Sequence, residues 1–267
     1  MDEQSVTEFH TKLVKSYDNF FQDIGFNFDD RKYQGFANLG YFDSLTTSMS
    51  HASENMIERL LSLVHKHDGM VLDVGCGLGG TTQHLTRYYS PEKIHGINIS
   101  DYQLEECRNR APNCHFHLMP AEALTFPDNT FDTIISVEAA CHFQGRREFL
   151  SEAMRVLKPG GELVVADILF HSQPTTFAKM LSGQEIYNSL EEYRSLWQSC
   201  GFDGVITHDV TLECWRGFSD YINKMLMRRV LERNIDASTF QRLLKFSRKI
   251  AKLPVSFYVF AHAVKTA

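Results

Sequence analysis

The stretch Val71-Leu72-Asp73-Val74-Gly75-Cys76-Gly77-Leu78-Gly79-Gly80 decides the fold of this chain of 267 residues. An apolar run ends in closely spaced glycines, and helical periodicity follows them, which is the strand–turn–helix context of a nucleotide-binding loop. Glycine permits a tight turn and lets a ligand approach the backbone without a Cβ in the way. The pattern satisfies both GxGxG and GxGxxG, so taken alone it does not separate a dehydrogenase from other adenosine-binding proteins.

Short apolar runs on both sides of this loop alternate with helical segments along the chain. Such alternation indicates βαβ units and a parallel sheet. The runs predict strands at 70–74, 93–99, 114–119, 132–137, 162–169, 203–211 and 256–265. The periodicity predicts helices at 2–22, 52–67, 79–89, 101–111, 145–157 and 189–200, and within 215–252. The predicted fold class is therefore α/β, a doubly wound, Rossmann-like sheet with an N-terminal helical lid and a helical insertion before the last strand.

No linker, repeat or low-complexity segment divides the chain, which predicts a single domain over 1–267. Within it we expect an N-terminal helix and aromatic lid at 1–51, a ligand-binding core at 52–169 and substrate-side helices with the last strands at 170–267. The charged helical face around Lys224 to Arg233 is interpreted as solvated.

Composition excludes several classes of function. The formal net charge is −6 with a pI near 6.0, so no strong positive field favours DNA or RNA. The six cysteines form no CxxC pair and lack zinc-ligand spacing, which predicts reduced thiols and no metal. The acidic N-terminal segment does not resemble a signal peptide, and no apolar run is long enough for a membrane span. We expect a soluble, cytoplasmic protein.

Asp73 narrows the choice of ligand. A carboxylate two residues before the loop would repel the pyrophosphate of a dinucleotide but attract a cationic ligand. S-adenosylmethionine carries a sulfonium and an ammonium, so the position favours it over a nicotinamide cofactor.

Four motifs in order over about 95 residues then resemble those of class I S-adenosylmethionine-dependent methyltransferases. They are the glycine loop, Gly96 to Ser100 with Gln103, Ala121 to Asp132, and Arg155 to Gly161. Glu138 to His142 and Asn38 to Phe42 resemble the small-molecule branch that includes sterol, tocopherol and natural-product enzymes. The resemblance implies a seven-stranded sheet with an antiparallel last strand, S-adenosylmethionine as cofactor and a small-molecule acceptor.

The resemblance also implies a set of cofactor contacts. The methionine half would be lined by four residues of the loop, with Asp73 ordering it: Gly75, Cys76, Gly77 and Gly79. Asn98 stands where many members carry an acid that bridges the ribose hydroxyls, and Gln103 resembles the ribose-contacting Gln of the branch that lacks the acid. Pro120 replaces the acid that usually meets adenine, so this contact falls to the neighbouring residues. The remaining predicted cofactor contacts are Ile99, Ala121 and Glu122.

Candidate catalytic groups follow strands whose carboxyl ends share one edge of the sheet. His142 can accept a hydroxyl proton at neutral pH, and Asp167 can orient it as a His–carboxylate pair. Glu138 is expected near the sulfonium or ammonium. A packing or capping role is the alternative for His142, and a buried structural carboxylate is the alternative for Glu138. The expected lid and facing wall of an apolar acceptor site comprise Tyr17, Tyr41, Phe42 and Trp215.

The sequence thus predicts methyl transfer from S-adenosylmethionine to a small, apolar or natural-product acceptor, with oxygen favoured over carbon or nitrogen. Two alternatives stay open. One is a catalytically silent S-adenosylmethionine-binding module, and the other is a nicotinamide-dependent oxidoreductase.

Overall fold

The computed structural model describes residues 3–19, 35–175, 181 and 185–266. One seven-stranded sheet runs through it in the order β3-β2-β1-β4-β5-β7-β6, with β7 antiparallel to both neighbours and the other six strands pointing one way. The predicted fold class is confirmed. The strands are β1 (Val71–Val74), β2 (Ile94–Asn98), β3 (His115–Leu118), β4 (Phe131–Val137), β5 (Leu157–Phe170), β6 (Asp203–Asp209) and β7 (Val255–Val264).

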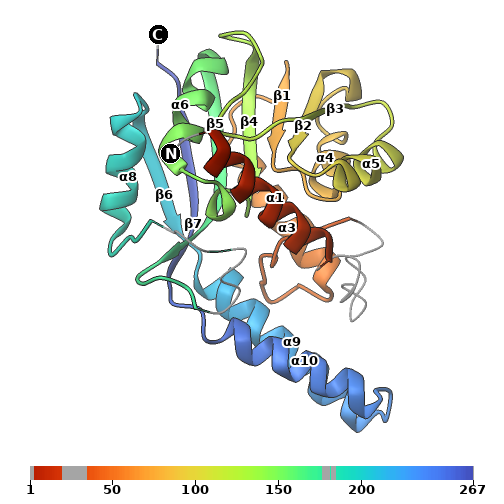
Figure 1. Ribbon diagram of the computed structural model, residues 1–267. Helices are drawn as coiled ribbons and strands as arrows, with labels where there is room; N and C mark the ends of the chain where they lie inside the picture. Colours follow the sequence, from red (N-terminus) through yellow and green to blue (C-terminus); the bar gives the residue numbers. More distant parts are fainter. Residues whose placement is uncertain (1–2, 20–34, 176–180, 182–184, 267) are drawn as a thin grey trace.

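Helices cover both faces of the sheet, and one pair projects from it (Figure 1). The long helices are α1 (Glu3–Asn19), α3 (Met49–Leu61), α5 (Asp101–Arg110), α6 (Arg146–Val156), α8 (Leu190–Ser199), α9 (Gly217–Leu231) and α10 (Ala237–Ile250). The short ones are α4 (Gly80–Leu85), η2 (Pro91–Lys93), η3 (Ala140–His142) and η4 (Leu212–Arg216). The segment predicted as helical over 215–252 is therefore a hairpin of two helices. No helix among the described residues is long and apolar enough to cross a membrane.

Side-chain caps fix where several helices begin. Ser48, Ser100, Ser189 and Asp236 each accept a hydrogen bond from the backbone N–H three residues later. These caps satisfy N–H groups that have no partner within the helix. The cap at Ser48 makes α3 begin earlier than the apolar periodicity predicts.

The central strand β5 is buried on both faces, as expected for a parallel sheet covered by helices. Leu163, Val165 and Leu169 pack in one apolar cluster with Phe149 of α6 and Trp197 of α8. The intervening side chains, Val164, Ala166, Ile168 and Phe170, pack in a second cluster with Met56 and Leu60 of α3. This alternation decides which side chains of β5 face each side of the sheet.

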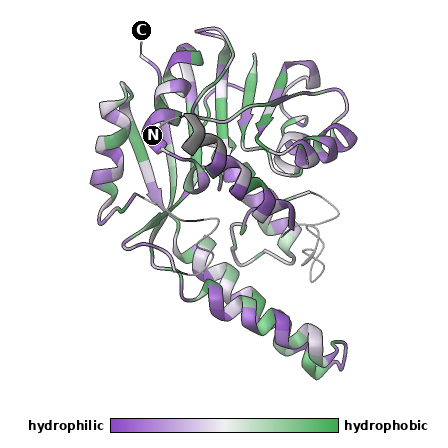
Figure 2. Cartoon of the chain, in the orientation of Figure 1, coloured by the Kyte–Doolittle hydropathy of each residue, from purple (hydrophilic) through white to green (hydrophobic). Residues whose placement is uncertain are grey.

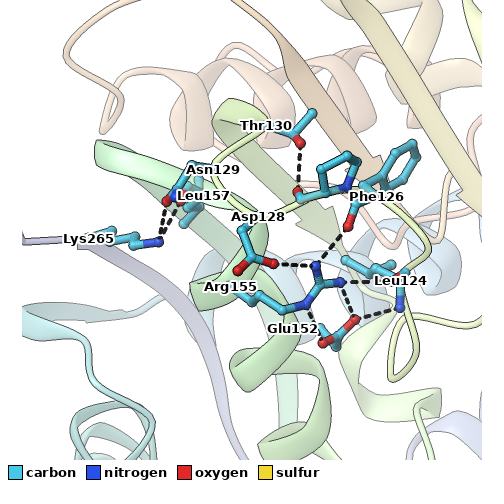
Figure 3. Close-up of polar contacts among 10 residues, drawn as sticks. Leu124, Phe126, Asp128, Asn129, Thr130, Glu152, Arg155, Leu157 and Lys265 are labelled. Atoms are coloured by element: carbon cyan, nitrogen blue, oxygen red, sulfur yellow. Dashed lines mark hydrogen bonds and ion pairs between the residues drawn. The ribbon is translucent and has the colours of Figure 1, made fainter.

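Arg155 ties the chain before β4 to α6 (Figure 3). Its guanidinium donates to the carbonyl oxygens of Phe126 (2.7 Å) and Leu124 (2.8 Å), and to the carboxylates of Asp128 and Glu152. Glu152 in turn accepts the backbone N–H of Leu124 at 2.7 Å. Hydrogen bonds from Arg155 are the main cause of the lowered pKa of Glu152. The contact anchors the segment that precedes β4 to the helix that follows it.

Asp73, at the end of β1, is 1% exposed and accepts a hydrogen bond from Thr82 Oγ1 of α4 at 2.6 Å. Burial raises its pKa to about 7, and the Thr82 hydrogen bond only partly offsets this. The carboxyl group therefore links the strand before the glycine loop to the helix after it.

We predict that Arg155→Ala lowers the free energy of unfolding by about 2 kcal/mol, because two carbonyl groups and two carboxylates lose a charged donor at once. Urea unfolding measures the loss. Arg194→Ala is the control, since Arg194 makes an exposed pair with Glu191 at 2.7 Å, and such pairs contribute less than about 1 kcal/mol. Equal losses in the two variants would contradict the anchoring role.

We also predict a pH-dependent contribution from Asp73. A carboxyl group with a raised pKa in the folded state holds its proton more tightly there than in the unfolded chain. Its contribution to stability is therefore full below about pH 4 and is lost as the pH rises through about 7. Relative to Asp73→Asn, the free energy of unfolding of the unchanged chain should fall by roughly 4 kcal/mol over this window, at about 1.4 kcal/mol per pKa unit. Unfolding at several pH values, without cofactor, measures it. A pH-independent difference would refute the raised pKa.

Candidate active site

A cavity of about 230 Å³ opens at the carboxyl ends of β1, β2, β4 and β5. This is the edge at which open α/β sheets bind ligands. Helix α1 covers one side with His10, Leu13, Val14 and Tyr17, and the α9–α10 region contributes Trp215, Phe218, Phe246, Ile250 and Leu253. The cavity therefore has a polar half, beside the glycine loop and β2, and an apolar half, beside β5 and the α9–α10 region.

The glycine loop turns tightly under the cavity. The N–H groups of Gly75 and Cys76 both donate to Ile97 O of β2, at 3.0 and 3.1 Å. Gly75, Gly77 and Gly79 all have positive φ, which L side chains rarely adopt. A Cβ on Gly75 would come within 2.4 Å of Ala139 Cβ, whereas a Cβ on Gly77 would meet only Ala37 Cβ, at 3.7 Å.

Four residues of this region were predicted to line the methionine half. The structure places Gly75 and Gly77 at the cavity. Cys76 instead lies beneath the loop with its Sγ 3.7 Å from Cys107 Sγ, and Gly79 packs against Cys107. Asp73 bonds to Thr82 and is not among the described residues that line the cavity, which agrees with its predicted role in ordering the loop.

Asn98 and Gln103 line the cavity where β2 ends, and they are bonded to Ser100 and Asp18, which lie behind this part of the wall. Asn98 Nδ2 donates to Gln103 Oε1 at 3.0 Å, so the two residues predicted as ribose contacts lie together. Gln103 Nε2 (3.3 Å) and Ser100 Oγ (2.8 Å) both donate to Asp18 Oδ1 of α1. A carboxylate thus approaches from α1 the position at which the sequence has Asn98 instead of an acid.

Ile99, Ala121 and Glu122, the remaining predicted cofactor contacts, also line the cavity. Glu122 accepts the backbone N–H of Gln144 and lies 4.0 Å from His10 Nε2 of α1. Its carboxylate is therefore held between two other elements that border the cavity.

Glu138 follows β4 with φ of 54°, in the left-handed region that is strained for a residue with a side chain. Its Oε1 accepts hydrogen bonds from the backbone N–H of Leu39 and from the hydroxyl of Tyr258. Burial, and next the charge of Glu138, raise the pKa of Tyr258 well above its ordinary value. Tyr258 therefore keeps its proton as a donor, and Glu138 is a fixed carboxylate at the cavity.

His142 faces Tyr17 across the cavity. The Tyr17 hydroxyl lies 2.5 Å from His142 Nε2, and the two rings meet edge to face with centroids 5.0 Å apart. Burial raises the pKa of Tyr17 well above its ordinary value, so the phenol keeps its proton. The preceding residue, Cys141, is buried and its thiol pKa is raised well above the ordinary value.

The predicted pairing of His142 with Asp167 is wrong. Arg146 donates to both carboxylate oxygens of Asp167, at 2.7 and 3.1 Å, and Tyr193 and the N–H of Ile168 supply two further hydrogen bonds. Successive side chains of a strand point to opposite faces of the sheet. Ile168 and Phe170 therefore reach the cavity, whereas Asp167 points to the other face.

The predicted aromatic wall is only partly found at the cavity. Tyr17 and Trp215 line it. Tyr41 packs beside Phe260 and under the guanidinium of Arg59, and Phe42 packs on Tyr221 of α9. These two side chains hold the segment before α3 on β7 and α9 instead of lining the cavity. The rest of the predicted lid, residues 20–34, lies outside the described residues.

Sequence reasoning missed Asp18. Its signal was present, because Asp18 falls on the same helical stripe as Val14 and Tyr17, but an acidic residue on an amphipathic helix is usually solvated. Phe246 and Ile250 of α10 were also missed, since nothing in the pattern shows that this helix returns to the cavity.

Comparisons with known proteins agree with this geometry. A family model described as a methyltransferase domain matches residues 72–165. The 2-methyl-6-phytyl-1,4-hydroquinone methyltransferase of Synechocystis is 44% identical over 36% of this chain, and the chain spans only 31% of that relative's length. The 27-O-demethylrifamycin SV methyltransferase of Amycolatopsis mediterranei is 26% identical over 85% of this chain and 88% of its own length.

Two further matches extend beyond the core. The cyclopropane synthase MmaA2 of Mycobacterium tuberculosis shares the fold, with a TM-score of 0.73 at 18% identity over 96% of each chain. Methyltransferase GfsG of Streptomyces halstedii is 31% identical over 69% of this chain and 70% of its own length. From the match to the family model, the extent of this similarity and the glycine loop at the sheet's carboxyl edge, we conclude that the chain belongs to the S-adenosylmethionine-dependent methyltransferases.

Proposed function

We propose that the protein transfers a methyl group from S-adenosylmethionine to a hydroxyl group of a small, apolar acceptor. One observation carries the proposal: the apolar half of the cavity is bordered by a histidine whose Nε2 faces the Tyr17 hydroxyl. A hydroxyl acceptor needs a group that removes its proton, and histidine does so near neutral pH. The rifamycin relative, whose name describes an O-demethylated substrate, supports oxygen as the methylated atom.

The residues of the polar half fit the cofactor. The space beside Gly77, where a Cβ would meet only Ala37, gives a ligand access to the backbone of the loop. Asn98 and Gln103 are polar groups suited to a ribose. Ala121 and Glu122 would border the adenine, and Glu138 would face the cationic methionine end. When bound, S-adenosylmethionine supplies a methyl group on a sulfonium, which is reactive enough that the protein mainly has to align the acceptor.

We further propose that Asp18 supplies the ribose-binding carboxylate that the end of β2 lacks. Asp18 already accepts hydrogen bonds from Ser100 and Gln103, so it is aimed at the place where Asn98 replaces the usual acid. A carboxylate accepts hydrogen bonds from both hydroxyls of a diol more strongly than an amide does. Helix α1 would then close on the bound cofactor through Asp18.

In the proposed reaction His142 acts as the base. Tyr17 keeps its proton, and its hydroxyl can donate a hydrogen bond to His142 Nε2. This hydrogen bond requires a free lone pair on Nε2, so the imidazole that accepts it is neutral. An acceptor hydroxyl that displaces the Tyr17 hydroxyl from Nε2 would release its proton to His142 as its oxygen bonds to the methyl carbon. The bond between that carbon and the sulfonium sulfur would break in the same step, leaving S-adenosylhomocysteine. The apolar wall of Ile168, Phe170 and Trp215 excludes water from this step.

All six cysteines are free thiols in the structure. A chain with reduced cysteines is suited to a reducing compartment. We propose that the enzyme works in the cytoplasm, in the biosynthesis of a small molecule.

The ribose assignment predicts that Asp18→Ala weakens binding of S-adenosylhomocysteine by about tenfold, the worth of a hydrogen bond to a charged group. Asp18→Ala should also discriminate less than the unchanged chain against the 2′-deoxy analogue. Asn98→Ala combined with Gln103→Ala should weaken binding at least as much. Calorimetry measures each, with the exposed Asp101→Asn as the control. If Asp18→Ala binds both ligands as the unchanged chain does, the assignment fails.

The base assignment predicts that His142→Ala lowers kcat for a hydroxyl acceptor by about 10²–10⁴, while S-adenosylhomocysteine binding stays unchanged. Apolar phenols, alcohols, amines and alkenes form the test panel, and the exposed His208→Ala is the control. A near-normal rate in His142→Ala would favour methylation of carbon or nitrogen, which needs no strong base. Cofactor binding without turnover of any class would instead favour the silent module.

A further inference from the structure

Positive charge is concentrated in the helical insertion between β6 and β7. Residues 216–252 contain ten Lys and Arg against three Asp and Glu, a net charge of +7. The whole chain carries −6, so the remaining residues carry −13. An acidic protein with one basic segment is oriented by that segment toward a negatively charged partner.

The basic side chains lie on the solvent side of the α9–α10 hairpin, which we define as α9, α10 and the turn 232–236. Four exposed residues, at intervals of three or four, form one basic stripe along α10 and its end: Arg242, Lys245, Lys249 and Lys252. Figure 1 shows the hairpin projecting from the sheet, and Figure 2 shows hydrophobic and hydrophilic residues side by side along it. The stripe is therefore presented away from the acidic remainder of the protein.

An apolar patch lies at the free end of α9. Met227, Val230 and Leu231 are 63%, 45% and 77% exposed. Arg228 and Arg233, both exposed, stand beside them. Large apolar side chains next to basic ones are typical of helices that lie in a membrane interface, where the apolar groups enter the headgroup boundary. The phosphates of a nucleic acid would attract the basic residues but leave the apolar patch in water.

We propose that the α9–α10 hairpin docks on the surface of an anionic lipid bilayer. The apolar patch of Met227, Val230 and Leu231 enters the headgroup boundary, and the basic stripe faces the lipid phosphates. Each Lys or Arg near such a surface adds to the attraction, which salt screens. The acidic remainder of the protein is repelled by the same surface, which favours the orientation with the hairpin inward.

The inner face of the hairpin gives this docking a consequence for the cavity. Phe218 of α9 and Phe246 and Ile250 of α10 form part of the cavity wall. The docked hairpin therefore holds the cavity close to the bilayer, where an apolar molecule is concentrated. This consequence for an acceptor rests on the proposed function, whereas the docking itself does not.

Co-sedimentation with vesicles tests the docking. The full chain is mixed with vesicles of phosphatidylcholine alone or of phosphatidylcholine with phosphatidylglycerol, and should bind the second kind more tightly, with a preference that falls as salt is added. Arg242→Glu with Lys245→Glu should weaken binding to the anionic vesicles about tenfold or more. Met227→Ser with Leu231→Ser should weaken it as well, because the apolar patch no longer enters the interface.

Lys66→Glu with Lys93→Glu is the matched control, since it makes the same change of charge at exposed positions outside the hairpin. It should keep most of the binding, and calorimetry with S-adenosylhomocysteine should show that every variant is folded. Equal binding to both kinds of vesicle, or equal loss in the control and the hairpin variants, would overturn the proposal. Unchanged vesicle binding of Met227→Ser with Leu231→Ser, together with equally tight binding of an RNA oligonucleotide, would also overturn it. Vesicle binding is measured without an acceptor, so a failure of the proposed methyl transfer leaves it unaffected.

Discussion

The carbonyl of Ile97 accepts hydrogen bonds from both Gly75 and Cys76, and the cavity depends on this contact. It pulls the turn after β1 against the end of β2, so the loop lies flat beneath the cavity instead of rising into it. The positive φ angles at Gly75, Gly77 and Gly79 are the conformational cost of this turn. Because parallel strands end at a common edge, the ends of β1, β2, β4 and β5 then surround a single space.

Helix α1 brings two adjacent side chains to different sides of the site, Tyr17 to the cavity itself and Asp18 to the residues behind its polar half. Tyr17 meets His142 after β4, and Asp18 meets Ser100 and Gln103 after β2. The placement of this one helix therefore positions both the Tyr17 hydroxyl and the Asp18 carboxylate. In the proposed function, a cofactor bound in the polar half would help keep α1, and with it Tyr17, next to the site of the acceptor.

The helical insertion between β6 and β7 has two faces with separate physical demands. Its inner face packs Phe218, Ile222 and Leu243 into an apolar cluster and completes the cavity wall. Its outer face packs against no other part of the described chain and carries a net positive charge, whereas the rest of the chain is net negative. Substitutions on the outer face of the insertion can therefore change its surface charge without altering the sheet or the glycine loop.

The sequence by itself determined the sheet, because its strong signals are local: apolar runs that alternate with helical periods, and a glycine loop between them. Through the family resemblance it also predicted that Asn98, the last residue of β2, and Gln103, five residues later in α5, both contact the ribose. Only the tertiary structure decided the partners of Asp167, Tyr41 and Asp18. Whether Asp167 lies beside His142 or Arg146 depends on which face of β5 its side chain takes, and the apolar pattern does not decide this because helices bury both faces of that strand. Asp18 reaches Gln103 across 85 residues of sequence, and only the packing of α1 over the carboxyl edge brings two such distant residues together.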